Sequence, residues 1–199
     1  MLYEHFIKEQ REEPSICHCG IDENLRPGVV YGPVIRDIYI VECCTGGHGS
    51  VIINGIEFPI KYGDCYFLFP GDTITHTASK TEPREGVWCA FDGLQVGSVL
   101  RKAGITSTSP FAPADSFDEI TSAVCKVVEM KEANDAGADL RRTALVYSIL
   151  GALMKYVSAS SDKNLWVRKA IGIMETNYHE PLKVEDIAFE IGLDRCYFR

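Results

Sequence analysis

The sequence of 199 residues lacks any apolar run of the roughly 18 residues needed to cross a membrane. Its first residues, MLYEHFIKEQREEP, are charged and contain no apolar core of a signal peptide. These two absences predict that the chain is neither embedded in a membrane nor exported, so we expect it in the cytoplasm. The eight cysteines are then expected to be reduced thiols rather than disulfides.

Clustered metal ligands are also scarce. The five histidines include no H-x-H pair, and the thiols of Cys17–Cys19 and Cys43–Cys44 lack the C-x-x-C spacing that is usual for zinc. A zinc site built from these two segments is an alternative, but thiols on cytosolic strands usually fill a core. We therefore predict no metal and no other cofactor.

A surplus of basic side chains, expected of a protein that binds DNA over its whole surface, is missing. The formal net charge is −8, from 20 basic and 28 acidic side chains. Residues 163–199 contain six of each sign, so the surplus lies before residue 163, as 14 basic against 22 acidic side chains. Because phosphates repel an acidic surface, residues 1–162 are predicted to do something other than bind DNA.

The first half of the chain has the patterns of β-structure. Short apolar runs recur at roughly ten-residue spacing with turn residues between them, which is typical of a sandwich or small barrel. The expected strands are ICHCGI, RDIYIVECC, GGHGSVIIN, IEFPIK, CYFLF, TITHTAS and GVWCAFD. The Asn54–Gly55 pair between two of them is a strong hairpin signal. The run from Pro27 to Pro33 is interpreted as turns.

After Gly93 the patterns become helical. Residues 94–103 are expected to form a short helix that ends at Gly104. Ser116 and Glu119 have the spacing of a capping box, which predicts a helix from there to about residue 133. Residues 158–162, SASSD, are small and polar and are expected to form a linker.

An apolar stripe follows a second long helix, which spans Leu140–Val157. Its members are Leu140, Ala144, Tyr147, Leu150 or Gly151, Met154 and Val157. One short neighbouring helix is not expected to cover this much apolar surface, so the stripe predicts a homodimer through this helix. The alternative is that the stripe packs wholly on the β-domain or on the preceding helix.

The stretch Leu182–Arg199 predicts two helices around a tight turn. Its first helix has an apolar stripe of Val184, Ile187, Ala188 and Ile191. Gly192 then ends that helix, and Asp194 offers an N-cap to a second one. The second helix would carry Arg195, Cys196 and Arg199 on its first turn, where a helix-turn-helix protein contacts bases. An ordinary αα-hairpin with solvated arginines is the alternative.

Motifs in both halves resemble those of AraC-family transcription regulators. In the C-terminal part they are Ile187–Ala188, Gly192–Leu193 and Tyr197–Phe198. In the first half, the cupin-type sensor domain of that family is resembled at Gly47–Gly49, Gly63–Asp64, Pro70, His76, Trp88, Phe91 and Gly93. Lys183 departs from the usual Ser or Thr N-cap. Family members also continue past this recognition helix into a second helix-turn-helix, so we expect the DNA-binding part to be incomplete.

The resemblance implies an α+β chain of three parts. Residues 1–93 would form a cupin-like ligand-sensing barrel with an N-terminal arm, and residues 94–160 a helical dimerisation region. Residues 161–199 would begin an AraC-type helix-turn-helix domain. The implied function is ligand-responsive DNA-binding transcription regulation, with a sugar-like effector as one partner and, in the full-length protein, promoter DNA as the other. The alternative is a cupin-fold enzyme, or a small-molecule-binding protein without a regulatory role, but His48 and His76 alone do not make a metal-dependent active site.

Three residues of the barrel are candidate ligand contacts. Trp88 offers a flat apolar face and one N–H, which suits stacking on a sugar ring. His76 can donate and accept hydrogen bonds, and Arg36, expected to open a strand, can pair with an anionic or hydroxyl-rich ligand. By the resemblance, His76 and Trp88 fall where family members contact their ligands. The alternatives are that Trp88 is a core residue and that His76 is a structural strand residue.

Overall fold

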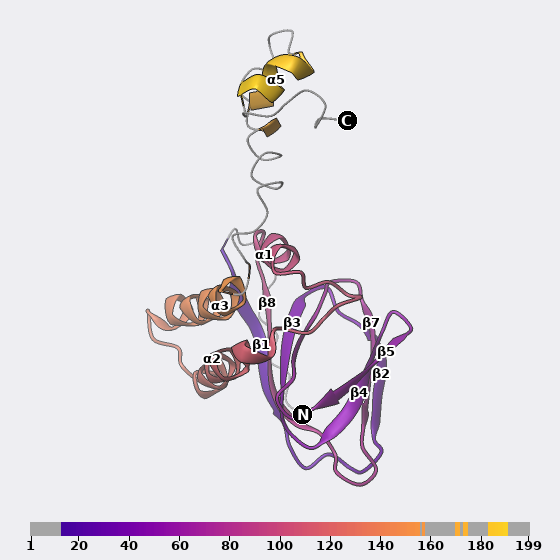
Figure 1. The fold of residues 1–199 in the computed structure, drawn as a ribbon. Helices are drawn as coiled ribbons and strands as arrows, with labels where there is room; N and C mark the ends of the chain where they lie inside the picture. The colour runs from indigo at the N-terminus through magenta and orange to yellow at the C-terminus, as the bar shows by residue number, and fades with distance from the viewer. Residues whose placement is uncertain (1–12, 156, 158–169, 172, 175–182, 191–199) are drawn as a thin grey trace. The chain divides into compact units, whose positions relative to one another are not determined.

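The computed structural model describes residues 13–155, 157, 170–171, 173–174 and 183–190. The chain divides into two compact units, residues 1–156 and residues 157–199, and each is described by itself. The described residues confirm the predicted α+β class, with two antiparallel sheets and flanking helices (Figure 1). The finer division of the chain at residues 93 and 160 stays a prediction.

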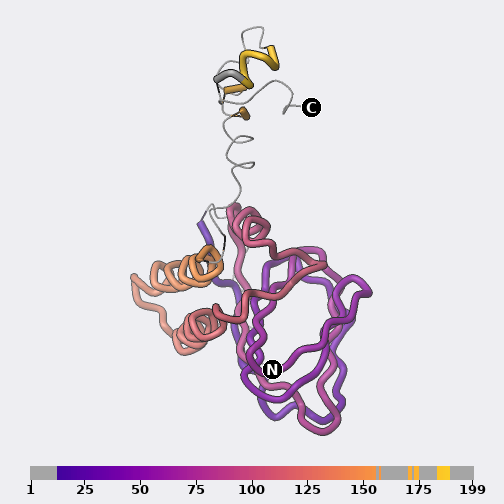
Figure 2. The backbone as a smooth tube through the Cα atoms, in the orientation of Figure 1, coloured from indigo at the N-terminus to yellow at the C-terminus, as the bar shows by residue number. Residues whose placement is uncertain are grey.

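Two four-stranded sheets lie opposite one another (Figure 2). The first has the order β1 (Ser15–Asp22), β8 (Glu85–Asp92), β3 (Tyr39–Gly46) and β6 (Cys65–Leu68). The second has the order β2 (Val30–Ile35), β7 (Thr73–Ala78), β4 (His48–Ile53) and β5 (Ile56–Lys61). Apart from the β4–β5 hairpin, neighbouring strands are far apart in the sequence, so side chains from the beginning and end of the β-region come together on one face.

Strand β2 contradicts the interpretation of residues 27–33 as turns. It pairs with β7 at the edge of the second sheet, and its register shifts between Tyr31 and Val34. Pro33 lacks an N–H group, but an edge strand with an irregular register does not need that donor. As a consequence Arg36 follows β2 and precedes β3, so the prediction that it opens a strand is wrong.

Helices cover the outer face of the first sheet (Figure 1). They are α1 (Val96–Lys102), the 3₁₀ turn η1 (Ala114–Ser116), α2 (Phe117–Glu129) and α3 (Ala138–Met154). Their apolar faces close a core whose members include Val41, Phe67, Phe91, Ile120, Val124, Ile149 and Leu153. The main core therefore lies between this sheet and the helices, which leaves the space between the two sheets to other residues.

The predicted capping box at the start of α2 does not form. The Ser116 hydroxyl donates to the carbonyl of Pro113 at 2.6 Å, and no side chain caps the helix. Ser116 already has helical backbone angles because η1 leads directly into α2, so its hydroxyl reaches back into the preceding turn. The helix ends at Glu129 rather than near Ala133, and the guanidinium of Arg142 donates to backbone carbonyls just beyond this end.

The apolar stripe of α3 is divided between core and solvent. Leu150 is buried, but Leu140, Tyr147 and Met154 are 70%, 49% and 38% exposed. The buried face of the helix is made by Val146, Ile149, Leu150, Ala152 and Leu153. The alternative that the stripe packs wholly on the β-domain or on α2 is therefore wrong.

In the second unit, α5 (Val184–Glu190) is the first helix of the predicted helix-turn-helix. Ile187 and Ala188 are buried, and Val184 is 54% exposed. The candidate DNA-binding residues Arg195, Cys196 and Arg199 lie outside the described residues. No helix in the described part of the chain is long and apolar enough to span a membrane.

Candidate functional site

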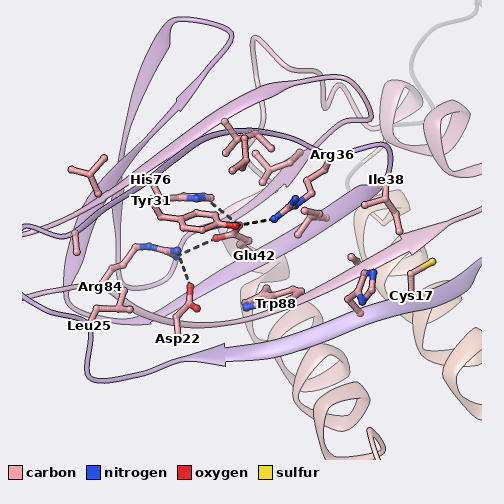
Figure 3. Close-up of a pocket in the computed structure, with 18 of the residues that line it drawn as sticks. Cys17, Asp22, Leu25, Tyr31, Arg36, Ile38, Glu42, His76, Arg84 and Trp88 are labelled. Carbon is pink, nitrogen blue, oxygen red and sulfur yellow. Dashed lines mark hydrogen bonds and ion pairs between the residues drawn. The ribbon is translucent and has the colours of Figure 1, made fainter. Parts of the chain in front are cut away.

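A pocket of about 880 Å³ opens between the two sheets. Its walls come from β1, β3 and β8 of the first sheet and from β2 and β7 of the second. All three residues proposed from the sequence as ligand contacts, Arg36, His76 and Trp88, line it (Figure 3). The fold thus brings together side chains that are separated by up to 52 positions in the sequence, from residue 36 to residue 88.

Trp88 is placed by a glycine on the neighbouring strand. It lies on β8 directly opposite Gly20 of β1. A Cβ added to Gly20 would come 2.7 Å from Cζ2 and 2.8 Å from Cε2 of the indole, closer than real Cβ contacts allow. The absence of a side chain at Gly20 therefore lets the ring lie against the backbone of β1. Trp88 is only partly buried and borders the pocket, so it is not solely a core residue.

A cluster of buried charges forms part of the pocket wall (Figure 3). The guanidinium of Arg84 donates to Oδ2 of Asp22 at 2.8 Å and to Oε2 of Glu42 at 3.1 Å. The hydroxyl of Tyr66 donates to the same Glu42 oxygen at 2.5 Å. Nε2 of His76 lies 3.2 Å from Oε1 of Glu42. The alternative of a purely structural His76 is consistent with that pairing, although the imidazole also borders the pocket.

Burial and pairing with opposite charges shift the pKa values of these groups in opposite directions. Burial alone would raise the pKa of Glu42, but His76 and Arg84 hold this pKa well below its usual range. Burial would likewise lower the pKa of Arg84, but Tyr66, Glu42 and Asp22 raise it. Burial raises the pKa of Asp22, and the nearby Arg84 offsets only part of this rise. The Glu42–Arg84 pair is therefore ionised inside the β-domain, and two carboxylates share the single positive charge of Arg84.

Arg36 has a different partner from that of Arg84. Its Nη2 donates to the hydroxyl of Tyr31 at 2.8 Å (Figure 3). Both side chains lie beside the pocket and are not buried. A guanidinium with one hydroxyl partner has further N–H groups that can donate to a ligand, so Arg36 stays a candidate ligand contact.

The geometry gives no support to a metal centre. Arg84 occupies the position between Asp22 and Glu42 that a cation would need. In the described ranges, no group of three or more His, Cys, Asp or Glu side chains can hold a metal ion. The thiols of the first segment considered for zinc are divided between two environments: Cys17 lines the pocket, whereas Cys19 packs against the core beneath the helices. Of the second segment, Cys43 packs in the core beneath the helices, and Cys44 packs in a smaller core made by residues of both sheets.

A pocket between two antiparallel sheets, lined by an aromatic ring and convergent hydrogen-bonding groups, has the usual features of a small-molecule-binding site. Residues 21–150 match the family model of the AraC-like ligand binding domain. The chain belongs to this family, and the resemblance drawn from its motifs is confirmed.

Two relatives are transcription regulators. The chain is 24% identical over 203 residues to the lactose operon transcription activator of Staphylococcus xylosus, covering 99% of this chain and 72% of that protein. It is 25% identical over 193 residues to the Msm operon regulatory protein of Streptococcus mutans, covering 92% and 68%. Among solved structures, ToxT from Vibrio cholerae covers 92% of this chain and 73% of its own, with 12% identity and a TM-score of 0.42.

Several residues of the site were missed from the sequence. Asp22, Glu42 and Arg84 carry no local motif, and Gly20 is one of 17 glycines. One signal was present: Glu42 is the single charged residue in the apolar run YIVECC. A lone carboxylate in a strand that is otherwise apolar needs a buried partner, and the structure supplies Arg84 and His76.

Proposed function

We propose that the chain is a ligand-responsive transcription regulator of the AraC family whose pocket binds a sugar. The observation that carries this proposal is the meeting of Trp88, His76 and Arg36 in one pocket of an AraC-like ligand-binding domain. A sugar presents an apolar ring face and a rim of hydroxyl groups. The indole suits the face, and the imidazole and guanidinium suit the hydroxyls.

The size of the pocket supports an effector larger than one sugar ring. Its volume of about 880 Å³ lies in the upper part of the roughly 300–1,000 Å³ range of small-molecule sites. The relative from Staphylococcus xylosus is named for the lactose operon, and lactose is a disaccharide. Disaccharides are therefore the first effectors to test.

A homodimer through α3 is part of the proposal. Leu140, Tyr147 and Met154 are exposed along one face of the helix, with the small residues Ala144 and Gly151 between them. Large apolar residues spaced by small ones let two helices approach closely, and a two-fold pair would bury the stripe of both copies.

The other proposed partner is promoter DNA, in the cytoplasm. Residues 161–199 would contact it through Arg195, Cys196 and Arg199, which stay a prediction. Effector binding would shift the population of pocket and helix arrangements and so change how two DNA-binding parts are presented.

A cupin-fold enzyme remains the alternative function. The proposal of a non-catalytic sensor is supported by the pairing of the buried ionisable groups. Asp22 and Glu42 both accept hydrogen bonds from Arg84, and no isolated acid or base is left among the three for proton transfer.

The proposed function is tested by thermal denaturation of the chain with a panel of mono- and disaccharides. A sugar at a hundredfold excess over its Kd should stabilise the fold by about 2.7 kcal/mol. A sugar that is bound and recovered unchanged after prolonged incubation supports a sensor. Conversion of the sugar would support the enzyme, and a panel without any stabilising member would contradict sugar sensing.

A further inference from the structure

The charges around the pocket are unequal in number. Among the described residues that line it, four carboxylates accompany two guanidinium groups and the imidazole of His76, which lies 3.2 Å from Glu42. The carboxylates belong to Asp22, Asp37, Glu42 and Asp92, and the guanidinium groups to Arg36 and Arg84. Because Arg84 is enclosed by two of the carboxylates, its charge is already balanced before any ligand arrives. An anion entering the pocket would therefore meet more negative than positive charge.

Asp22 is the member of the buried cluster that is most open to the pocket. Its side chain is 18% exposed, against 9% for Glu42 and 7% for Arg84. Arg84 donates to its Oδ2, and Trp88 is a neighbour of its carboxylate. Figure 3 shows the indole nitrogen turned toward Asp22. A carboxylate has about four lone-pair sites, so Asp22 retains capacity to accept hydrogen bonds from a ligand beside the aromatic ring.

We propose that the pocket selects uncharged sugars over their phosphorylated forms, and that Asp22 sets this selectivity. This inference rests on the sugar-sensing function proposed above. The hydroxyl groups of a neutral sugar donate to the Asp22 carboxylate while the ring lies on Trp88. A phosphate dianion would instead be brought next to Asp22 and Glu42 in a poorly solvated wall, where repulsion between like charges is stronger than in water.

The selectivity has a consequence for where the effector comes from. The sugar must be supplied by a process that leaves its hydroxyl groups free, such as uptake without phosphorylation or release from a larger glycoside. Phosphorylation of the sugar would end its action as an effector, because the product no longer fits the charges of the pocket.

The test is isothermal titration of the full chain with matched pairs of sugars. Suitable pairs are lactose, trehalose, sucrose, galactose and glucose, each with its own 6-phosphate. The neutral member of at least one pair should bind, and its phosphate should bind at least about tenfold more weakly. Equal or tighter binding of the phosphate would overturn the charge selectivity while leaving sugar sensing intact. Binding of no member of any pair would instead overturn the proposed function.

Salt separates electrostatic rejection from a steric one without any mutation. If like charges exclude the phosphate, raising the salt concentration from 0.05 M to 1 M should bring the affinities of the two forms closer together by several fold. Because charges in a poorly solvated wall are screened less than charges in open water, the change should be smaller than at a surface site, and a preference for the neutral sugar that grows with salt would overturn electrostatic rejection.

The role of Asp22 is tested by Asp22→Asn, which keeps the size of the side chain and removes its charge. The variant should bind the neutral sugar about tenfold more weakly, because a hydrogen bond to a charged group is replaced by one to a neutral group. Its discrimination against the phosphate should fall to less than about threefold. The matched control is Glu23→Gln, which removes the neighbouring exposed charge outside the pocket lining and should leave both affinities unchanged. Unchanged discrimination in a folded Asp22→Asn protein would overturn the assignment of Asp22.

Discussion

Gly20 on β1 lies directly opposite Trp88 on β8, and the indole occupies the space in which a side chain of residue 20 would lie. The orientation of the candidate stacking ring is thus set by a residue that has no side chain of its own. Gly20 is a positioning residue for the pocket, and it can be altered without removing any group that would contact the effector.

We predict that Gly20→Ala weakens effector binding by about tenfold or more by displacing the indole, since a Cβ would come 2.7 Å from Cζ2. The measurement is the Kd of the tightest-binding sugar. The same substitution in a Trp88→Phe background should have a much smaller effect, because the smaller ring leaves room for the methyl group. Equal effects in both backgrounds would show that Gly20 acts through the general fold of β1 rather than through the ring.

Trp88 should report effector binding by fluorescence. The chain has two tryptophans, Trp88 and Trp166. A Trp166→Phe variant should retain the change in emission on adding the sugar, and a Trp88→Phe variant should lose it. The latter should also bind the sugar more weakly, by about 1 kcal/mol or more, because it loses ring area and the indole N–H group. A full response and full affinity in Trp88→Phe would place the effector elsewhere.

Glu42 makes the stability of the first unit depend on pH. Its pKa is lowered on folding from an ordinary value of 4.5, because His76 and Arg84 outweigh the effect of burial. The stabilisation that it contributes is therefore present above about pH 4.5 and is lost as the pH falls toward the folded value. The pKa of Asp22 is raised on folding by burial, so its contribution to stability becomes more favourable as the pH falls. It therefore offsets part of the stability that is lost at Glu42.

We predict that the urea midpoint of the wild-type chain falls between pH 6 and pH 3, and that Glu42→Gln shows a smaller fall because it has no carboxylate to protonate at this position. At neutral pH the variant should be less stable by about 3–5 kcal/mol, the usual result of removing one partner of a buried ion pair. The same pH dependence in both proteins would mean that other carboxylates control acid unfolding.

The α3 face should control dimerisation. Tyr147→Glu should convert a dimer at tens of micromolar into a monomer, because the glutamate would place a charge in an apolar contact. The matched control is Leu94→Glu, which changes a leucine that is 72% exposed outside α3, comparable to the 70% of Leu140. Analytical ultracentrifugation gives the result directly. A wild-type monomer at this concentration, or a Tyr147→Glu variant that stays dimeric, would contradict the proposed interface.

The strands were predictable wherever turn residues separate them, as at Asn54–Gly55. β2 was not, because Gly32 and Pro33 usually mark a turn, and only pairing with β7 makes Val30–Ile35 an edge strand. The stripe on α3 was predictable as apolar. The packing of α3 on β1 and α2 decides which residues of the stripe face the core. The spacing of apolar residues in the sequence does not specify this packing.

The candidate site was predictable only in part, because its members are brought together by strand pairing that no local motif specifies. His76 and Trp88 stand out through their motifs, and Arg36 through its place near a strand. The partnership of Asp22 with Arg84 spans 62 positions and arises because β1 pairs with β8, which begins at Glu85 directly after Arg84. Gly20 acquires its role only from the same pairing. Contacts of this kind follow from topology, which a single sequence does not contain.

The most direct test of the sugar-sensing pocket is a crystal structure of the chain with the tightest-binding neutral sugar. We expect electron density for the sugar between the two sheets, with a ring face on Trp88 and hydroxyl groups within hydrogen-bonding distance of Asp22 and Arg36. Density for a specifically bound sugar outside this pocket, with the pocket unchanged, would contradict the account.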